Sequence, residues 1–113
     1  MSMWSRIKSA IGGHTPPQTL SSAATLTLPD DDNLFYLTGT TTITSLVTPS
    51  SIRNRKVTII GGSDAEVAFT NTNDPTTAGQ MYLHGQNRIV REDDVIELFC
   101  KADGTWILLN LVN

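Results

Sequence analysis

The stretch Val95-Ile-Glu-Leu-Phe-Cys-Lys-Ala-Asp-Gly-Thr-Trp-Ile-Leu-Leu-Asn-Leu-Val112 decides the fold class. It contains two apolar runs, 95–101 and 105–112, and Asp103-Gly104 lies between them. Asp-Gly between two such runs is the strongest short-range signal for a β-hairpin, because both residues tolerate the backbone conformation of a tight turn. The C-terminal part of the chain is therefore predicted to form a hairpin.

The same kind of pattern continues toward the N-terminus as far as Ser21. Short runs rich in β-branched residues recur at 25–28, 34–38, 40–47, 56–60, 66–70 and 81–83. Every gap between the runs contains Gly, Asn, Asp or Pro, which are the residues that form turns. About eight short strands with short connections predict an all-β fold, namely a small sandwich, barrel or prism-like domain.

The composition is that of a polar chain that carries little charge. Of the 113 residues, 39% are hydrophobic and 17% are charged, and the formal net charge is -3. A low net charge with many β-branched residues favours ordered sheets over disorder, and the length suits one domain. The slightly acidic balance gives no electrostatic attraction to phosphate backbones or anionic lipids. We therefore expect neither nucleic acid nor a membrane as a partner.

The cell compartment follows from the absence of targeting signals. No apolar stretch approaches the roughly 18 to 20 residues of a membrane span, and the first ten residues lack the apolar core of a signal peptide. The single cysteine, Cys100, excludes an intrachain disulfide framework. We expect a protein that is made in a bacterial cytoplasm.

Residues 1–19 are predicted to form an N-terminal arm, and residues 20–113 are predicted to form the β-domain. Trp4, Ile7 and Ile11 follow a spacing of three and then four residues. This spacing puts the three side chains on one face of a short amphipathic helix.

Gly12-Gly13 can end this helix, and Pro16-Pro17 stiffens the exit from it. A helix of this length is marginal in water, so it needs a surface to pack against. That surface is either the β-domain itself or a partner. Because the Gly/Pro hinge separates the helix from the domain, we expect the three apolar side chains to anchor the protein to a partner.

No arrangement of histidines or cysteines in the sequence predicts a metal or cofactor site. His14 and His84 each lack a second ligand at metal-binding spacing. Cys100 could act as a nucleophile with His84, since such partners can be distant in sequence. Cys100, however, lies in an apolar strand, and burial there raises the pKa of a thiol and makes it inert.

The acidic and glycine-rich segments are also interpreted as turns. Gly61-Gly-Ser-Asp64 lacks the lysine and the helix of a phosphate-binding loop. Asp30-Asp-Asp32 lacks the spaced carboxylates of a calcium loop. Asp93 and Asp94, with Glu92, could supply the carboxylate pair of a glycoside hydrolase, but consecutive acidic residues before a strand are typical of a solvated turn. We therefore expect no enzymatic activity and no cofactor.

The strands predict self-association. Aromatic residues make up 6% of the chain, and threonine fills many strand positions, so a single copy has little material for a core. A closed symmetric oligomer would complete the core and cover exposed strand edges. The alternative is a stable monomer whose threonines face solvent.

Four segments carry a resemblance to a known family. They are Thr25-Leu-Thr-Leu-Pro29, Phe35-Tyr-Leu-Thr-Gly-Thr-Thr-Thr-Ile-Thr44, Lys56-Val-Thr-Ile-Ile60 and Asp94-Val-Ile-Glu-Leu-Phe-Cys-Lys-Ala-Asp-Gly-Thr-Trp106. In this order they resemble a module of tailed-bacteriophage structural proteins, which occurs in tail fibres, tailspikes, head fibres and decoration proteins. The resemblance covers roughly residues 20–110. It implies a homotrimer in which strands of the three chains pack about a common axis.

The resemblance leads to an expected place on the phage particle. Fibres and spikes usually carry this module within much longer chains, whereas this chain consists of an arm, a hinge and one β-module. It is more similar to a capsid decoration protein, a cement protein or head fibre on the virion surface that is attached to the major capsid protein by its arm. Three arms on one trimer bind more tightly than one, because the later contacts are intramolecular. The alternative is a tail fibre, spike or adaptor component that contacts a tail protein and host surface glycans.

Overall fold

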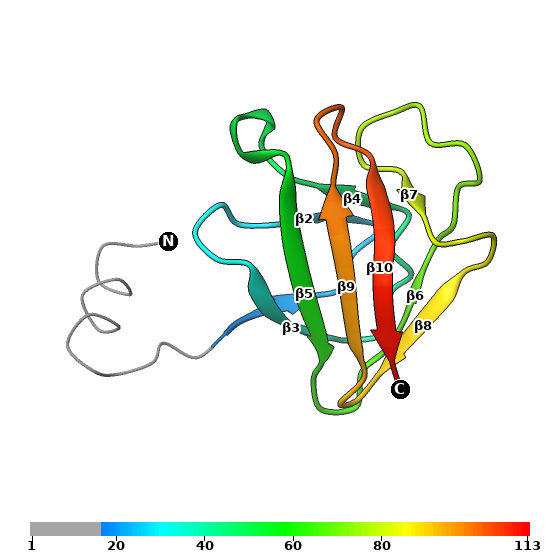
Figure 1. Ribbon diagram of the computed structural model, residues 1–113. Helices are drawn as coiled ribbons and strands as arrows, with labels where there is room; N and C mark the ends of the chain where they lie inside the picture. Colours follow the sequence, from blue (N-terminus) through cyan, green and yellow to red (C-terminus); the bar gives the residue numbers. More distant parts are fainter. Residues whose placement is uncertain (1–16) are drawn as a thin grey trace.

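The computed structural model describes residues 17–113, and these residues form an all-β domain, which confirms the predicted fold class (Figure 1). The strands are β1 (Gln18–Ser21), β2 (Thr25–Thr27), β3 (Leu34–Thr38), β4 (Ser45–Val47), β5 (Arg55–Gly61), β6 (Glu66–Phe69), β7 (Met81–Tyr82), β8 (Arg88–Arg91), β9 (Val95–Cys100) and β10 (Trp106–Val112), with a 3-10 turn, η1 (Ser50–Ile52), before β5. In this part of the chain no helix has the length and apolarity needed to cross a membrane. The predicted N-terminal helix lies outside the described residues.

The strands form one large sheet and two small ones. The large sheet has the order β1-β3-β5-β9-β10-β7, and the small sheets are β2-β4 and β6-β8. Strands β1, β3 and β5 pair in parallel, and so do β2 and β4. From β1 to β5 the chain therefore alternates between two sheets, and each return places a strand beside the previous one. In Figure 1, β5, β9 and β10 cross in front of β2 and β4.

The C-terminal hairpin forms as predicted. Strands β9 and β10 pair antiparallel, and Cys100 lies opposite Trp106. Gly104 takes a φ of 86°, which glycine adopts without strain. The backbone N–H and hydroxyl of Thr105 both donate to the Asp103 carboxylate, at 2.9 and 2.7 Å. Asp103, Gly104 and Thr105 therefore each have a separate role in the turn.

The core lies between the large sheet and the two small sheets. It is a single contiguous cluster of buried side chains: Leu26, Leu28, Phe35, Leu37, Ile43, Leu46, Val57, Ile59, Val67, Phe69, Met81, Leu83, Val90, Ile96, Leu98, Cys100, Trp106 and Leu108. Trp106 is fully buried, and its indole Nε1 donates to the Leu46 carbonyl oxygen at 2.8 Å. One chain thus closes a core despite its few aromatic residues, so a reason for self-association has to be found on the surface.

The strands differ from the predicted runs in three places. β1 and β8 were not predicted, and β1 begins at Gln18, inside the predicted arm. The run 40–47 is a strand only from Ser45, because the chain turns from the large sheet to a small one after Gly39, which has a φ of 92°. Ile43 still forms an isolated parallel bridge to Phe69.

Candidate functional site

The large sheet has one face that the described chain leaves uncovered. We call outer face the side of β5, β9 and β10 that points away from the core. Side chains alternate along β9, where Ile96, Leu98 and Cys100 point inward and Val95 and Phe99 point outward. Strand pairing places the outward side chains in three rows: Ile60, Val95 and Val112; Thr58, Glu97 and Asn110; and Lys56, Phe99 and Ile107.

Two of these rows are largely apolar, and they flank a polar middle row. Val112 is 52% exposed, and so is Leu109, which lies at a bulge in β10. The charges on the outer face are those of Lys56 and Glu97, which form an ion pair with Nζ and Oε2 at 3.3 Å. The face therefore combines two largely apolar rows with one polar row and carries no net charge. Exposed apolar side chains beside polar ones, such as Val112 and Leu109 here, are typical of association surfaces.

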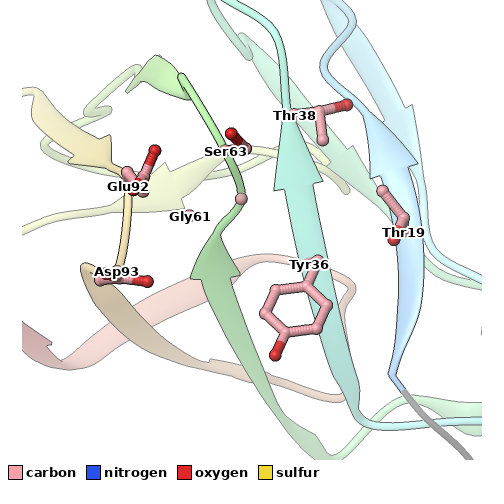
Figure 2. Close-up of a pocket in the computed structure, with 8 residues that line it drawn as sticks. Thr19, Tyr36, Thr38, Gly61, Ser63, Glu92 and Asp93 are labelled. Carbon is pink, nitrogen blue, oxygen red and sulfur yellow. The ribbon is translucent and has the colours of Figure 1, made fainter.

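A second feature is an open groove of about 370 Å³ that begins where β5 ends. Its lining side chains and backbone come from β1, β3, the last residue of β5 and two turns: Thr19, Tyr36, Thr38, Gly61, Gly62, Ser63, Glu92 and Asp93. In Figure 2 the ring of Tyr36 stands between Thr19 on one side and Asp93 on the other. Thr19 and Tyr36 are register partners in the parallel pair of β1 and β3. The groove thus joins residues that are distant in the sequence.

Hydrogen bonds between the two turns fix the walls of the groove. The Asp93 N–H donates to the Gly61 carbonyl at 2.9 Å, and the Gly61 N–H donates to the Asp94 carbonyl at 2.9 Å. The Asp64 N–H donates to Glu92 Oε1, also at 2.9 Å. A Cβ on Gly61 would lie 1.8 Å from the Arg91 carbonyl oxygen, so this close approach requires glycine.

The structure separates the acidic residues that were considered as a carboxylate pair. Asp93 and Glu92 line the groove. Asp94 is buried, at 8% exposure, and its Oδ2 accepts a hydrogen bond from the Arg91 N–H at 2.8 Å. Asp94 therefore stabilises the turn between β8 and β9 and does not line the groove. Gly61 is the last residue of β5, and residues 62–64 belong to the predicted turn between β5 and β6.

The Asp30–Asp32 segment is a turn between β2 and β3 that is organised by Arg55. The Arg55 guanidinium donates to the Pro29 carbonyl at 3.2 Å, to the Thr48 hydroxyl at 2.9 Å and to the Asp32 carbonyl. Burial lowers the pKa of Arg55. Within residues 17–113 no group of three or more His, Cys, Asp or Glu side chains is arranged to hold a metal ion. Sequence reasoning missed the role of Arg55, which comes from outside the acidic run.

Cys100 and His84 have separate partners. Cys100 is fully buried, its thiol donates to the Lys101 carbonyl at 3.5 Å, and burial raises the pKa of this thiol. His84 is exposed, and its Nε2 is hydrogen-bonded to the Leu108 carbonyl at 2.8 Å, with the ring centroid 4.9 Å from that of Tyr82. The two side chains therefore do not form a nucleophile and base pair.

The predicted anchor residues Trp4, Ile7 and Ile11, and also His14, lie outside the described residues, so their roles stay predictions. The chain matches no protein-family model, no curated protein and no solved structure.

Proposed function

We propose that this chain is a non-enzymatic structural protein of a bacteriophage particle, which self-associates as a homotrimer through the outer face and decorates the capsid. The observation that carries the proposal is the pair of largely apolar rows on the outer face of β5, β9 and β10. Strands of a sheet that faces solvent usually carry polar outward residues. β2 follows that rule, with Thr25 and Thr27 exposed on either side of buried Leu26. β9 and β10 depart from it.

The charges favour another copy of the same chain as the partner. Since Lys56 and Glu97 neutralise each other, two outer faces brought together experience no net repulsion. In an oligomer, Lys56 of one copy can also pair with Glu97 of the next. A closed ring of copies covers every apolar face without open-ended growth. The number three comes from the resemblance to trimeric phage modules.

Attachment to the particle is assigned to the N-terminal arm. The first strand of the described domain, β1, begins at Gln18 on an edge of the large sheet, so an arm would be joined to the domain at that edge. Trp4, Ile7 and Ile11 would bind the major capsid protein. Three such arms on one trimer would raise the overall affinity well above that of a single arm.

Two variants test the outer face. Val112→Glu places a charge at a 52% exposed position of this face, and Ile89→Glu places the same charge at a 38% exposed position of β8, outside it. We expect wild type and Ile89→Glu to be trimers by light scattering, and Val112→Glu to be a monomer of 12.3 kDa that retains its circular dichroism spectrum. A wild-type protein that is monomeric at all micromolar concentrations would refute the proposed association.

Removal of residues 1–16, which leaves β1 intact, tests the arm. The truncated protein should remain a trimer but lose binding to capsids that lack the protein. Full occupancy by the truncated protein would refute the anchor. Electron cryo-microscopy of intact virions tests the location, since density on the tail would favour the alternative of a tail component.

A further inference from the structure

The groove between β3 and the 91–94 turn presents solvent-exposed polar groups that make no hydrogen bond to the described part of the protein. Within residues 17–113 the Asp93 carboxylate, the Tyr36 hydroxyl and the Thr19 hydroxyl make no hydrogen bond. Tyr36 also leaves 38% of its surface exposed, and its ring lies at the centre of the view in Figure 2. An exposed aromatic ring surrounded by unpaired donors and acceptors is a typical pattern of ligand sites.

We propose that this groove binds a saccharide, specifically a neutral or amino sugar. A sugar ring has a face of C–H groups, which can pack on the Tyr36 ring, and a rim of hydroxyls. The rim hydroxyls can donate to the Asp93 carboxylate and exchange hydrogen bonds with the Thr19 hydroxyl. The volume of about 370 Å³ is at the small end of the range for ligand sites, which suits a short saccharide.

The charge of the groove selects among saccharides. Glu92 and Asp93 are the charged residues in the lining, and both are acidic. The neighbouring Arg91 is 3.8 Å from Glu66 and pairs with that residue. The groove therefore repels carboxylated or phosphorylated sugars, and it accepts neutral sugars or the ammonium group of an amino sugar.

The same geometry indicates binding without cleavage. Glycoside hydrolysis requires two carboxyl groups that face the bond to be broken. Glu92 Oε1 is engaged by the Asp64 N–H, and Asp94 is buried below the turn. Of the pair Asp93 and Asp94, Asp93 alone lines the groove, where its carboxylate can accept sugar hydroxyls.

The groove is also preformed. The turns that carry Gly61 and Asp93 are joined by two backbone hydrogen bonds of 2.9 Å, and the Gly62 N–H donates to the Leu37 carbonyl at 2.7 Å. A ligand therefore does not have to order these turns, which reduces the entropy cost of binding.

The experiment is a titration of the full chain followed by amide chemical shifts in two-dimensional NMR. The probes are the methyl glycosides of glucose, galactose and N-acetylglucosamine, together with glucosamine; N-acetylneuraminic acid and the peptide Gly-Lys-Gly serve as an anionic and a cationic comparison. We expect at least one neutral or amino sugar to bind with a Kd on the order of 1 to 10 mM. The shifts should be confined to Gly61–Ser63, Asp93 and Tyr36.

Variants connect the shifts to the proposed contacts. Tyr36→Ala and Asp93→Asn should each weaken binding at least about tenfold. Tyr36→Phe keeps the aromatic ring and should retain most of the sugar binding. It also shows whether a loss in Tyr36→Ala comes from the missing ring or from a loss of folding. Tyr82→Ala, which removes a partly exposed tyrosine outside the groove, should bind as wild type does.

Three results would overturn the inference: no groove shift with any of the neutral or amino sugars up to about 20 mM, unchanged binding by Tyr36→Ala, or a preference for N-acetylneuraminic acid or the peptide. The groove borders the outer face, since Tyr36 is the register partner of Ile60, but none of its lining residues belongs to the three rows of that face. The Val112→Glu variant should therefore bind the same sugar, so that a failure of one proposal can be told from a failure of the other.

Discussion

Replacing Trp106 with phenylalanine should destabilise the domain strongly without unfolding it. Trp106 is fully buried in β10, and its Nε1 donates to the Leu46 carbonyl of β4 at 2.8 Å. This hydrogen bond joins the C-terminal hairpin to the small β2-β4 sheet, 60 residues earlier in the chain. Phenylalanine keeps an aromatic ring in the core but has no donor.

The expected loss has two parts. Leu46 is fully buried, so its carbonyl would lose this partner without gaining water, which costs about 1 to 3 kcal/mol. The smaller ring removes roughly 40 Å² of apolar contact, which is worth about 1 kcal/mol at ~25 cal/mol per Å². The free energy of unfolding should therefore fall by about 2 to 4 kcal/mol, out of the roughly 5 to 15 kcal/mol that is typical of a domain.

Guanidinium denaturation followed by far-ultraviolet circular dichroism measures this loss. Leu109→Ala is the matched control, because Leu109 is in the same strand but 52% exposed, and it should change the free energy of unfolding by less than about 1 kcal/mol. The measurement is made on the Val112→Glu background, which is expected to be monomeric, so that dissociation of an oligomer does not contribute. A loss below about 0.5 kcal/mol for Trp106→Phe would refute the role assigned to this hydrogen bond.

Two further predictions concern ionisable side chains. The hydrogen bond from the Thr105 hydroxyl, and then that from its backbone N–H, lower the pKa of Asp103. A carboxylate with a lowered pKa stabilises the folded state at pH values above the ordinary carboxyl pKa of about 4. This contribution to the free energy of unfolding disappears as the pH falls through the lower folded-state pKa. Thermal melts should therefore show a decline in stability below about pH 4 that is smaller in Asp103→Asn, and equal declines would contradict the assignment. Burial raises the pKa of Cys100, so a thiol reagent at neutral pH should label it slowly in the folded protein and rapidly in denaturant; rapid labelling of the folded protein would contradict this.

Local signals in the sequence predicted the hairpin and most of the strands, because each depends on neighbouring residues. Asp103-Gly104 requires nothing beyond its own turn. The parallel pairing of β1, β3 and β5 was not predictable in this way, since alternating side chains look alike in parallel and antiparallel pairs. β8 was missed because the arginines at both of its ends, Arg88 and Arg91, obscure a strand with one buried residue, Val90.

The residues of the groove also fall into two groups, those that the sequence made candidates and those that it did not. Glu92 and Asp93 were candidate site residues in the sequence, because a pair of carboxylates can hydrolyse a glycosidic bond. Tyr36 and Thr19 did not, because their place beside the acidic turn depends on strand register and on the close approach at Gly61. A site of this kind is assembled from several strands, and no spacing in the sequence encodes it.

The stretch 95–112 is more apolar than the core of one chain requires. The core requires apolar residues on one face of β9 and β10, and Leu98 and Trp106 supply that face. Val95, Phe99 and Ile107 are apolar on the other face as well. Near-continuous apolar runs are typical of strands that are covered on both sides. The described chain covers one side, and further copies of the chain would cover the other, which is why the same residues that predict the hairpin also support the proposed self-association.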